Sequence, residues 1–114
     1  MSRRGWHRTR DAEGGVVLAR GARRFDVSVE TWLPAAPPAR IAHQVRQDLW
    51  RALQKLRGFA PVVSVTPVEA GLRVVAGGTV AGAIPPGTGD RIAAVLEHPG
   101  NRARWLAHAR RGQR

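Results

Sequence analysis

Arginine is the residue type whose number and placement in this chain could do chemistry, and that chemistry is the binding of anions. The 114-residue sequence has a formal net charge of +11, and nine arginines within residues 1–10 and 101–114 supply nine of those charges. Neither of these two ends contains an acidic residue, whereas residues 11–100 are nearly balanced in charge. A near-neutral body with two basic ends is typical of proteins that bind polyanions. The expected partner is therefore a nucleic acid, with RNA favoured over DNA, or an acidic protein or ribonucleoprotein complex.

The candidate nucleic-acid-binding residues are the terminal arginines and one tryptophan that lies among them. They are Arg3, Arg4, Trp6, Arg8, Arg10, Arg102, Arg104, Arg110, Arg111 and Arg114. An indole flanked by guanidinium groups can stack on a base while the guanidinium groups hold phosphates. Two alternative interpretations stay open. In one, Trp6 does not bind a base but folds back to cover an apolar gap. In the other, the basic ends are solvated tails in which codon bias favours arginine over lysine.

Other chemistries find little support in the residue types. Residues 84–91 resemble a phosphate-binding loop in outline, but that motif requires glycine at position 84 and lysine at position 90, where this chain has Ile84 and Asp90. The chain has no cysteine, and no two of its histidines stand four residues apart as zinc-binding pairs on a helix do. No pair of carboxylates has a spacing that suggests acid–base catalysis. We therefore expect a non-enzymatic protein with no metal, no cofactor and no evident small-molecule substrate.

The pattern of apolar residues predicts an α+β fold. Strands are expected over residues 15–20, 25–33, 61–68, 72–76 and 79–84, with a bend at Gly77-Gly78, and the first two can pair as a hairpin. Helices are expected over residues 39–57, from an Asp90 cap to residue 97, and from an Asn101 cap onward. The expected order is ββαβ(β)βαα, a small antiparallel sheet of about four or five strands, with one long helix and two short C-terminal helices packed on one face.

The long helix has the clearest periodicity. Its apolar stripe should pack Ile41, Val45, Leu49, Leu53 and Leu56 against the sheet, and its polar side carries Arg40, Gln44, Gln47, Arg51 and Lys55.

The remaining tryptophans differ in context. Trp50 and Trp105 are expected in the core. Trp32 falls on the polar side of its strand, where it covers a helix end, marks an interface or reflects a bulge.

Composition also predicts the domain organisation. Residues 1–14 are expected to form a flexible basic arm, residues 15–110 a single domain, and residues 111–114 a basic tail. No segment approaches the roughly 20 apolar residues that a membrane helix needs, so we expect no membrane partner and a cytoplasmic location. Nucleic-acid binding is the leading functional hypothesis. The alternative is a protein-interaction module, a subunit or assembly factor of a larger complex whose basic arms order on the partner.

Overall fold

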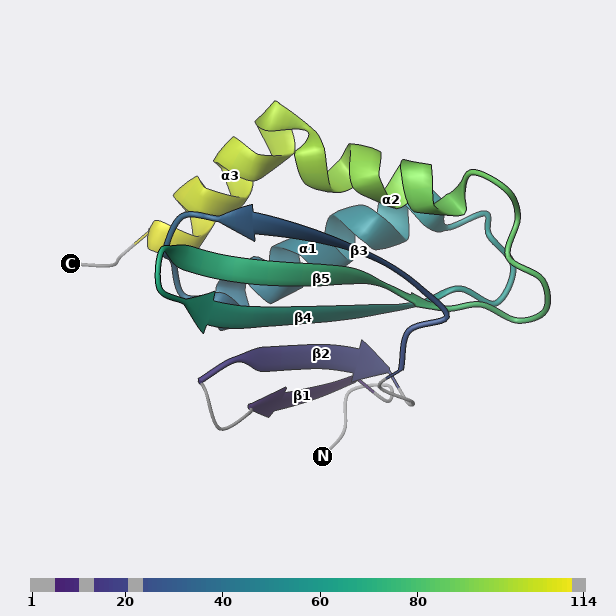
Figure 1. The fold of residues 1–114 in the computed structure, drawn as a ribbon, viewed down its shortest axis with the longest axis horizontal. Helices are drawn as coiled ribbons and strands as arrows, with labels where there is room; N and C mark the ends of the chain where they lie inside the picture. Colours follow the sequence, from purple (N-terminus) through teal and green to yellow (C-terminus); the bar gives the residue numbers. More distant parts are fainter. Residues whose placement is uncertain (1–5, 11–13, 21–23, 112–114) are drawn as a thin grey trace.

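The computed structural model describes residues 6–10, 14–20 and 24–111, and for residues 6–10 and 20 we describe the backbone alone. Within these residues lie the strands β1 (Trp6–Arg10), β2 (Val16–Arg20), β3 (Val27–Leu33), β4 (Ala60–Val68) and β5 (Gly71–Thr79). The helices are α1 (Pro38–Leu53), α2 (Thr88–Glu97) and α3 (Pro99–Arg110). The described strands form one antiparallel sheet in the order β1-β2-β4-β5-β3 (Figure 1). The predicted fold class, including one long and two short C-terminal helices, is confirmed.

The pairing of the first two predicted strands is wrong. Instead of forming a hairpin, β2 pairs with β1 and β4, whereas β3 lies at the opposite edge beside β5. A second correction concerns β5, which runs unbroken from Gly71 to Thr79 rather than bending at Gly77 and Gly78, so the separate strand expected over residues 79–84 does not form. A Cβ at Gly77 would lie 1.9 Å from the Val27 carbonyl oxygen, and one at Gly78 would lie 2.1 Å from that of Ala60. These glycines therefore permit close approach of both neighbouring strands.

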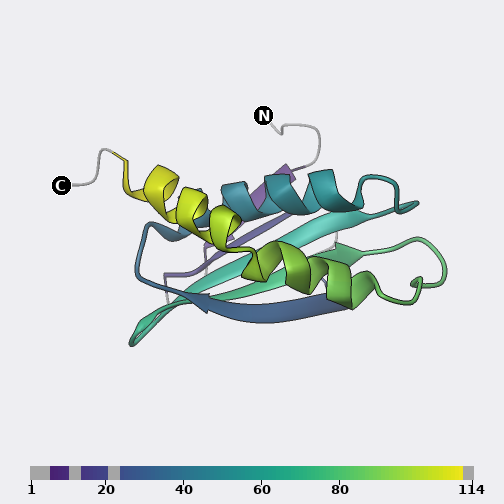
Figure 2. The same ribbon diagram turned by 90° about the horizontal axis from the view of Figure 1, so that it is seen from above.

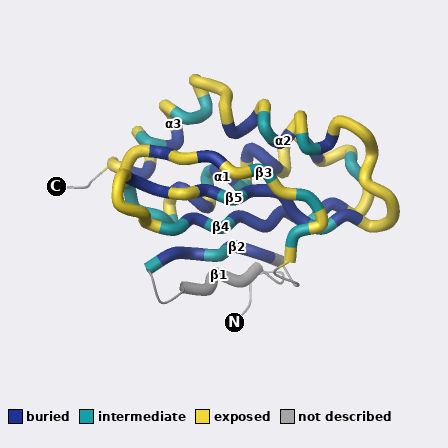
Figure 3. Tube along the Cα trace, in the orientation of Figure 1, coloured by how far each residue is buried: buried dark blue, intermediate teal, exposed yellow. Residues whose placement is uncertain are grey.

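All three helices lie on one side of the sheet, as Figure 2 shows. The core fills the space between these layers, and buried residues run along β2, β4, β5 and the inward side of α1 (Figure 3). In β3, Thr31 and Leu33 are buried beneath the helices, while the intervening Trp32 is exposed on the opposite, helix-free face. That alternation is the expected one for a half-buried strand.

Helix α1 confirms the predicted apolar stripe. Ile41, Val45, Leu49 and Leu53 are fully buried, and Leu56 packs partly against the core from the turn after the helix. The helix ends at Leu53, before the expected end at residue 57. Trp105 is buried in the core as predicted.

The prediction of a core position for Trp50 is wrong, because 46% of its surface is exposed. Trp50 lies at the border of the apolar stripe, where helical spacing alone does not decide between core and solvent.

The two C-terminal helices begin earlier than predicted. Helix α2 starts at Thr88 after Gly87, so Asp90 lies in its first turn instead of capping it. Helix α3 starts at Pro99, and the His98 Nδ1 accepts a hydrogen bond of 3.2 Å from the Asn101 backbone N–H. Pro99 therefore opens a helix, because proline at the first helical position lacks only a donor that would be unpaired there.

The N-terminal segment differs from the expected arm over part of its length. Residues Trp6–Arg10 form strand β1, which pairs with β2 from Trp6↔Arg20 to Arg10↔Val16. Residues 1–5, 11–13 and 112–114 lie outside the described part of the chain. Among the described helices, none has both the length and the apolar character needed to cross a bilayer.

Candidate nucleic-acid interface

The outward sides of α1 and α3 carry a row of basic and amide side chains that we call the α1–α3 strip. Because the inward side of α1 is apolar, its polar residues gather on the solvent side of the helix. The residues of the strip are Arg40, Gln44, Gln47 and Arg51 on α1, Lys55 in the following turn, Arg104 and His108 on α3, and Arg111 just beyond it. All of them except the half-buried Gln44 are exposed.

Direct contacts join the two helices of the strip. Arg104 Nη1 donates to Gln44 Oε1 at 3.5 Å, and Arg40 Nη1 donates to the backbone oxygens of Ala109 and Arg111 at 3.1 and 2.9 Å. The carbonyl groups at a helix C-terminus lack partners within the helix and attract a cation. Arg40 therefore fixes the end of α3 against the start of α1, and the two basic rows lie side by side.

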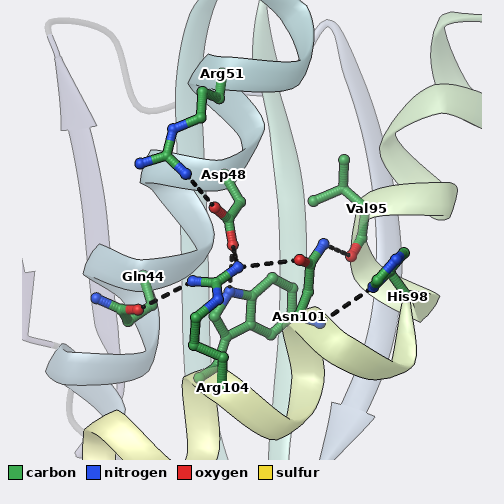
Figure 4. A network of polar contacts seen from close by, with 8 residues as sticks. Gln44, Asp48, Arg51, Val95, His98, Asn101 and Arg104 are labelled. Atoms are coloured by element: carbon green, nitrogen blue, oxygen red, sulfur yellow. Dashed lines mark hydrogen bonds and ion pairs between the residues drawn. The ribbon is translucent and has the colours of Figure 1, made fainter.

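Asp48 is the acidic centre beneath the strip, and Figure 4 shows the donors that surround it. Its Oδ2 accepts hydrogen bonds from Trp105 Nε1 and Arg104 Nη2, both at 2.7 Å, and its Oδ1 accepts from Arg51 Nη1 at 3.4 Å. Asp48 is buried and is the one acidic residue in the sequences of α1 and α3. The exposed side of the strip is therefore cationic, with its single carboxylate already bonded from within.

Arg104 is held in place by a second polar partner. Its Nη2 also donates to Asn101 Oδ1 at 3.0 Å, and the Asn101 amide donates to the Val95 backbone oxygen at 3.0 Å (Figure 4). Since Val95 belongs to α2, Asn101 ties the guanidinium group to the junction between α2 and α3. The position of Arg104 is thus fixed before any anion arrives, while 48% of its side chain remains exposed.

The structure gives two other C-terminal arginines intramolecular partners. Arg102 Nη1 donates to Thr31 Oγ1 at 3.1 Å and to the Leu96 oxygen at 2.9 Å, and its Nη2 donates to the Trp32 oxygen. Arg110 Nη2 donates to the Ala35 oxygen at 2.8 Å. These arginines attach α3 to β3 and to the connection that follows it, so they serve the fold whether or not they also meet an anion.

The remaining candidate residues from the sequence lie where the structure describes no side chains. The predicted contacts of Arg3, Arg4 and Arg114 fall outside the described residues. Trp6, Arg8 and Arg10 lie in β1, where the backbone alone is described. Their proposed roles stay predictions.

Sequence reasoning placed Arg40, Arg51 and Lys55 on the polar side of a helix but did not include them among the binding residues. The helical spacing was a visible signal. Helical spacing could not show that α3 lies beside the polar side of α1, because this contact joins residues far apart in the sequence. Gln44 and Arg104, for example, are 60 residues apart.

Within the described ranges, no group of three or more metal-ligating side chains comes together. The loop before α2, which resembles a phosphate-binding loop in sequence, bonds to itself: Thr88 Oγ1 donates to the Pro85 oxygen at 2.7 Å, and Thr88 is buried.

The chain matches no protein-family model, no curated protein and no solved structure.

Proposed function

We propose that this protein is a small, non-catalytic nucleic-acid-binding protein, with RNA favoured over DNA, that holds phosphates with the α1–α3 strip and the arginines near its termini. The observation that carries the proposal is the strip itself: a row of mostly exposed basic and amide side chains whose single carboxylate, Asp48, is buried and already bonded. Such a surface favours a polyanionic backbone, because each phosphate contact releases counterions. A body of sheet and helices with basic extensions suits the recognition of RNA by shape and backbone.

The charge balance elsewhere supports the same proposal. Four carboxylates of the described residues already have arginine partners, namely Asp26, Glu30, Asp48 and Glu97. The formal charge of +11 already counts every acidic residue, so it is an excess that the chain's own acids do not cancel. A polyanion compensates for such an excess at long range and speeds association.

The test compares two arginines in similar settings. Arg51 in the strip is 63% exposed and lies 3.4 Å from Asp48, while Arg24 is 67% exposed and lies 3.2 Å from Asp26, outside the helices that carry the strip. Each is changed to Gln, and the affinity for single-stranded and duplex RNA is measured over a range of salt concentrations. Arg51→Gln should reduce the slope of log affinity against log salt by about 0.7–0.9, and Arg24→Gln should leave the slope unchanged.

A triple change at Arg51, Lys55 and Arg111 to Gln should reduce the salt slope by about 2 to 3. Equal slopes for the parent and the triple variant would remove the strip from the interface. A parent protein that binds neither RNA nor DNA at low salt would overturn the proposed function.

The second candidate function is a protein-interaction module, a subunit or assembly factor of a larger complex. It is favoured by the intramolecular use of Arg102, Arg104 and Arg110, because a basic C-terminus that stabilises the fold needs no nucleic acid to explain it. Co-purification separates the two functions. A heteromeric complex that survives nuclease and high salt would favour the module, whereas an ultraviolet spectrum dominated by nucleic acid favours the first function.

A further inference from the structure

Trp32 is a large aromatic side chain that the fold leaves on an open surface. It lies on the helix-free face of the sheet near one end of edge strand β3, and 54% of its surface is exposed. The register from Val27↔Gly78 to Leu33↔Leu72 is continuous, so no bulge between these residues turns Trp32 outward by accident. Of the three interpretations of Trp32 from the sequence, the bulge is thus excluded, and an interface stays open.

The charged side chains near Trp32 are paired with carboxylates, and one of them holds its backbone in place. Its neighbour across the strands is the exposed Arg73, whose guanidinium group pairs with Glu30 on the same face. Arg102 donates to the Trp32 carbonyl oxygen from the other side of the strand. An indole on an edge strand with a fixed backbone is presented to solvent at little further cost in conformational entropy.

Two arginine contacts lead from the α1–α3 strip toward the end of the strand that carries Trp32. From the strip, Arg40 bonds to the Ala109 oxygen, and the next residue, Arg110, bonds to the Ala35 oxygen three positions after Trp32. This path leads from the outward side of the helices to the connection that follows β3, two residues after the strand ends. The molecule is thin in that direction, since its shortest extent is 22 Å.

A ligand that contacts both surfaces must be anionic, aromatic and flexible. A nucleic-acid duplex is stiff over about 150 base pairs, so it cannot follow the path around the edge of so small a domain, and its bases are already stacked. A single strand bends freely and offers unstacked bases. Charge complementarity also favours a nucleic acid over a second copy of the chain, because two copies with a formal charge of +11 each repel one another.

We propose that Trp32 stacks on a base of a single-stranded nucleic acid whose phosphates lie on the α1–α3 strip. The inference rests on the proposed function and names the form of nucleic acid that the protein prefers. Arg73 and the arginines of the connecting path then lie within reach of the backbone next to the stacked base.

The test uses a single-stranded RNA of mixed sequence and the same RNA as a blunt duplex, with Trp32→Ala as the main variant. Stacking of one base on an aromatic ring contributes about 1–3 kcal/mol, so Trp32→Ala should raise the Kd for the single strand by about 5- to 150-fold. The Kd for the duplex should not change, and Trp32→Phe should recover much of the affinity for the single strand. The matched control is Trp50→Ala, which removes an indole of similar exposure from α1 and should change neither Kd.

Each other result has a definite meaning. If Trp32→Ala binds the single strand as the parent does, or loses single-strand and duplex binding equally, the stacking inference is overturned while the salt-dependent function stands. If the parent binds neither RNA, both the function and the inference fail. A dimer of the parent that Trp32→Ala converts to a monomer, with unchanged RNA affinity, would instead assign this face to a second copy. Thermal melting of each variant confirms that it is folded.

Discussion

At the scale of single residues, Asp48 shows how one carboxylate organises a cationic surface. It accepts from a buried indole N–H and from two arginines, and so it joins the core side of α3 to the exposed strip. Hydrogen bonds from charged donors to a buried acceptor are stronger than those between neutral groups. Removing the acceptor leaves its donors without a partner. Arg51 lies on the same helix as Asp48, but the other two donors, Arg104 and Trp105, come from α3, more than fifty residues away, which local sequence pattern does not show.

Asp48→Ala should therefore lower the free energy of unfolding by about 1–3 kcal/mol, because Trp105 Nε1 would lose its acceptor inside the core. Asp48→Asn should cost less, since the amide oxygen can still accept from Trp105 while the ion pairs are lost. Urea denaturation of the parent and both variants measures the difference. If alanine and asparagine cost the same, the hydrogen bond to Trp105 contributes nothing measurable.

Asp26 gives a prediction about pH. The backbone N–H of Val80 donates to its carboxylate at 2.9 Å, and together with Arg24 this lowers the pKa of Asp26 from its usual value, against the opposing effect of burial. A carboxyl group whose pKa is lower in the folded state stabilises the fold above its unfolded-state pKa of about 4, and that stabilisation is lost as the pH falls through the folded-state pKa.

Asp26→Asn should consequently be less stable than the parent at pH 7. The difference between the two proteins should shrink below about pH 4 and vanish at still lower pH. Denaturation curves at pH 7, 4 and 2 measure that difference. A difference that stays constant across this range would mean that the charge of Asp26 does not contribute to stability.

At the scale of elements, α1 is the helix around which the others are arranged. It packs on β2, β4 and β5 with its apolar side, and it contacts α2 and α3 along its flank. Its sequence predicted it most clearly because an apolar stripe at helical spacing is a local signal. Its last turn was predicted too long, since Leu56 continues the spacing although the chain leaves the helix after Leu53.

Leu49→Ala should lower the free energy of unfolding by about 2–5 kcal/mol, because Leu49 is fully buried and its removal leaves a cavity beneath α1. Arg51→Ala is the control on the opposite side of the same helix and should cost no more than about 0.5 kcal/mol. Thermal or urea denaturation compares the two. A Leu49→Ala variant as stable as the parent would mean that this side of α1 does not carry the core.

At the scale of the whole molecule, the class of the fold was predictable and the neighbours in its sheet were not. Runs of β-branched residues and one amphipathic helix indicate α+β from local pattern alone. The pairing of Val16–Arg20 with β4 depends on contacts across more than forty residues, which periodicity does not contain. The same limit applies to the site. Basic ends were visible, but the meeting of Arg104 with Gln44, and the exposure of Trp32 and Trp50, depend on how the elements pack.

The bond between Arg102 and the Trp32 carbonyl has a consequence for self-association. An edge strand presents unpaired backbone groups to which the strand of another molecule can add, and this is a common route to aggregation. β3 is such an edge, and the Arg102 guanidinium group occupies a carbonyl oxygen that an incoming strand would need. By crossing this edge with a charged side chain, α3 hinders the addition of another molecule's strand at β3, the edge opposite β1.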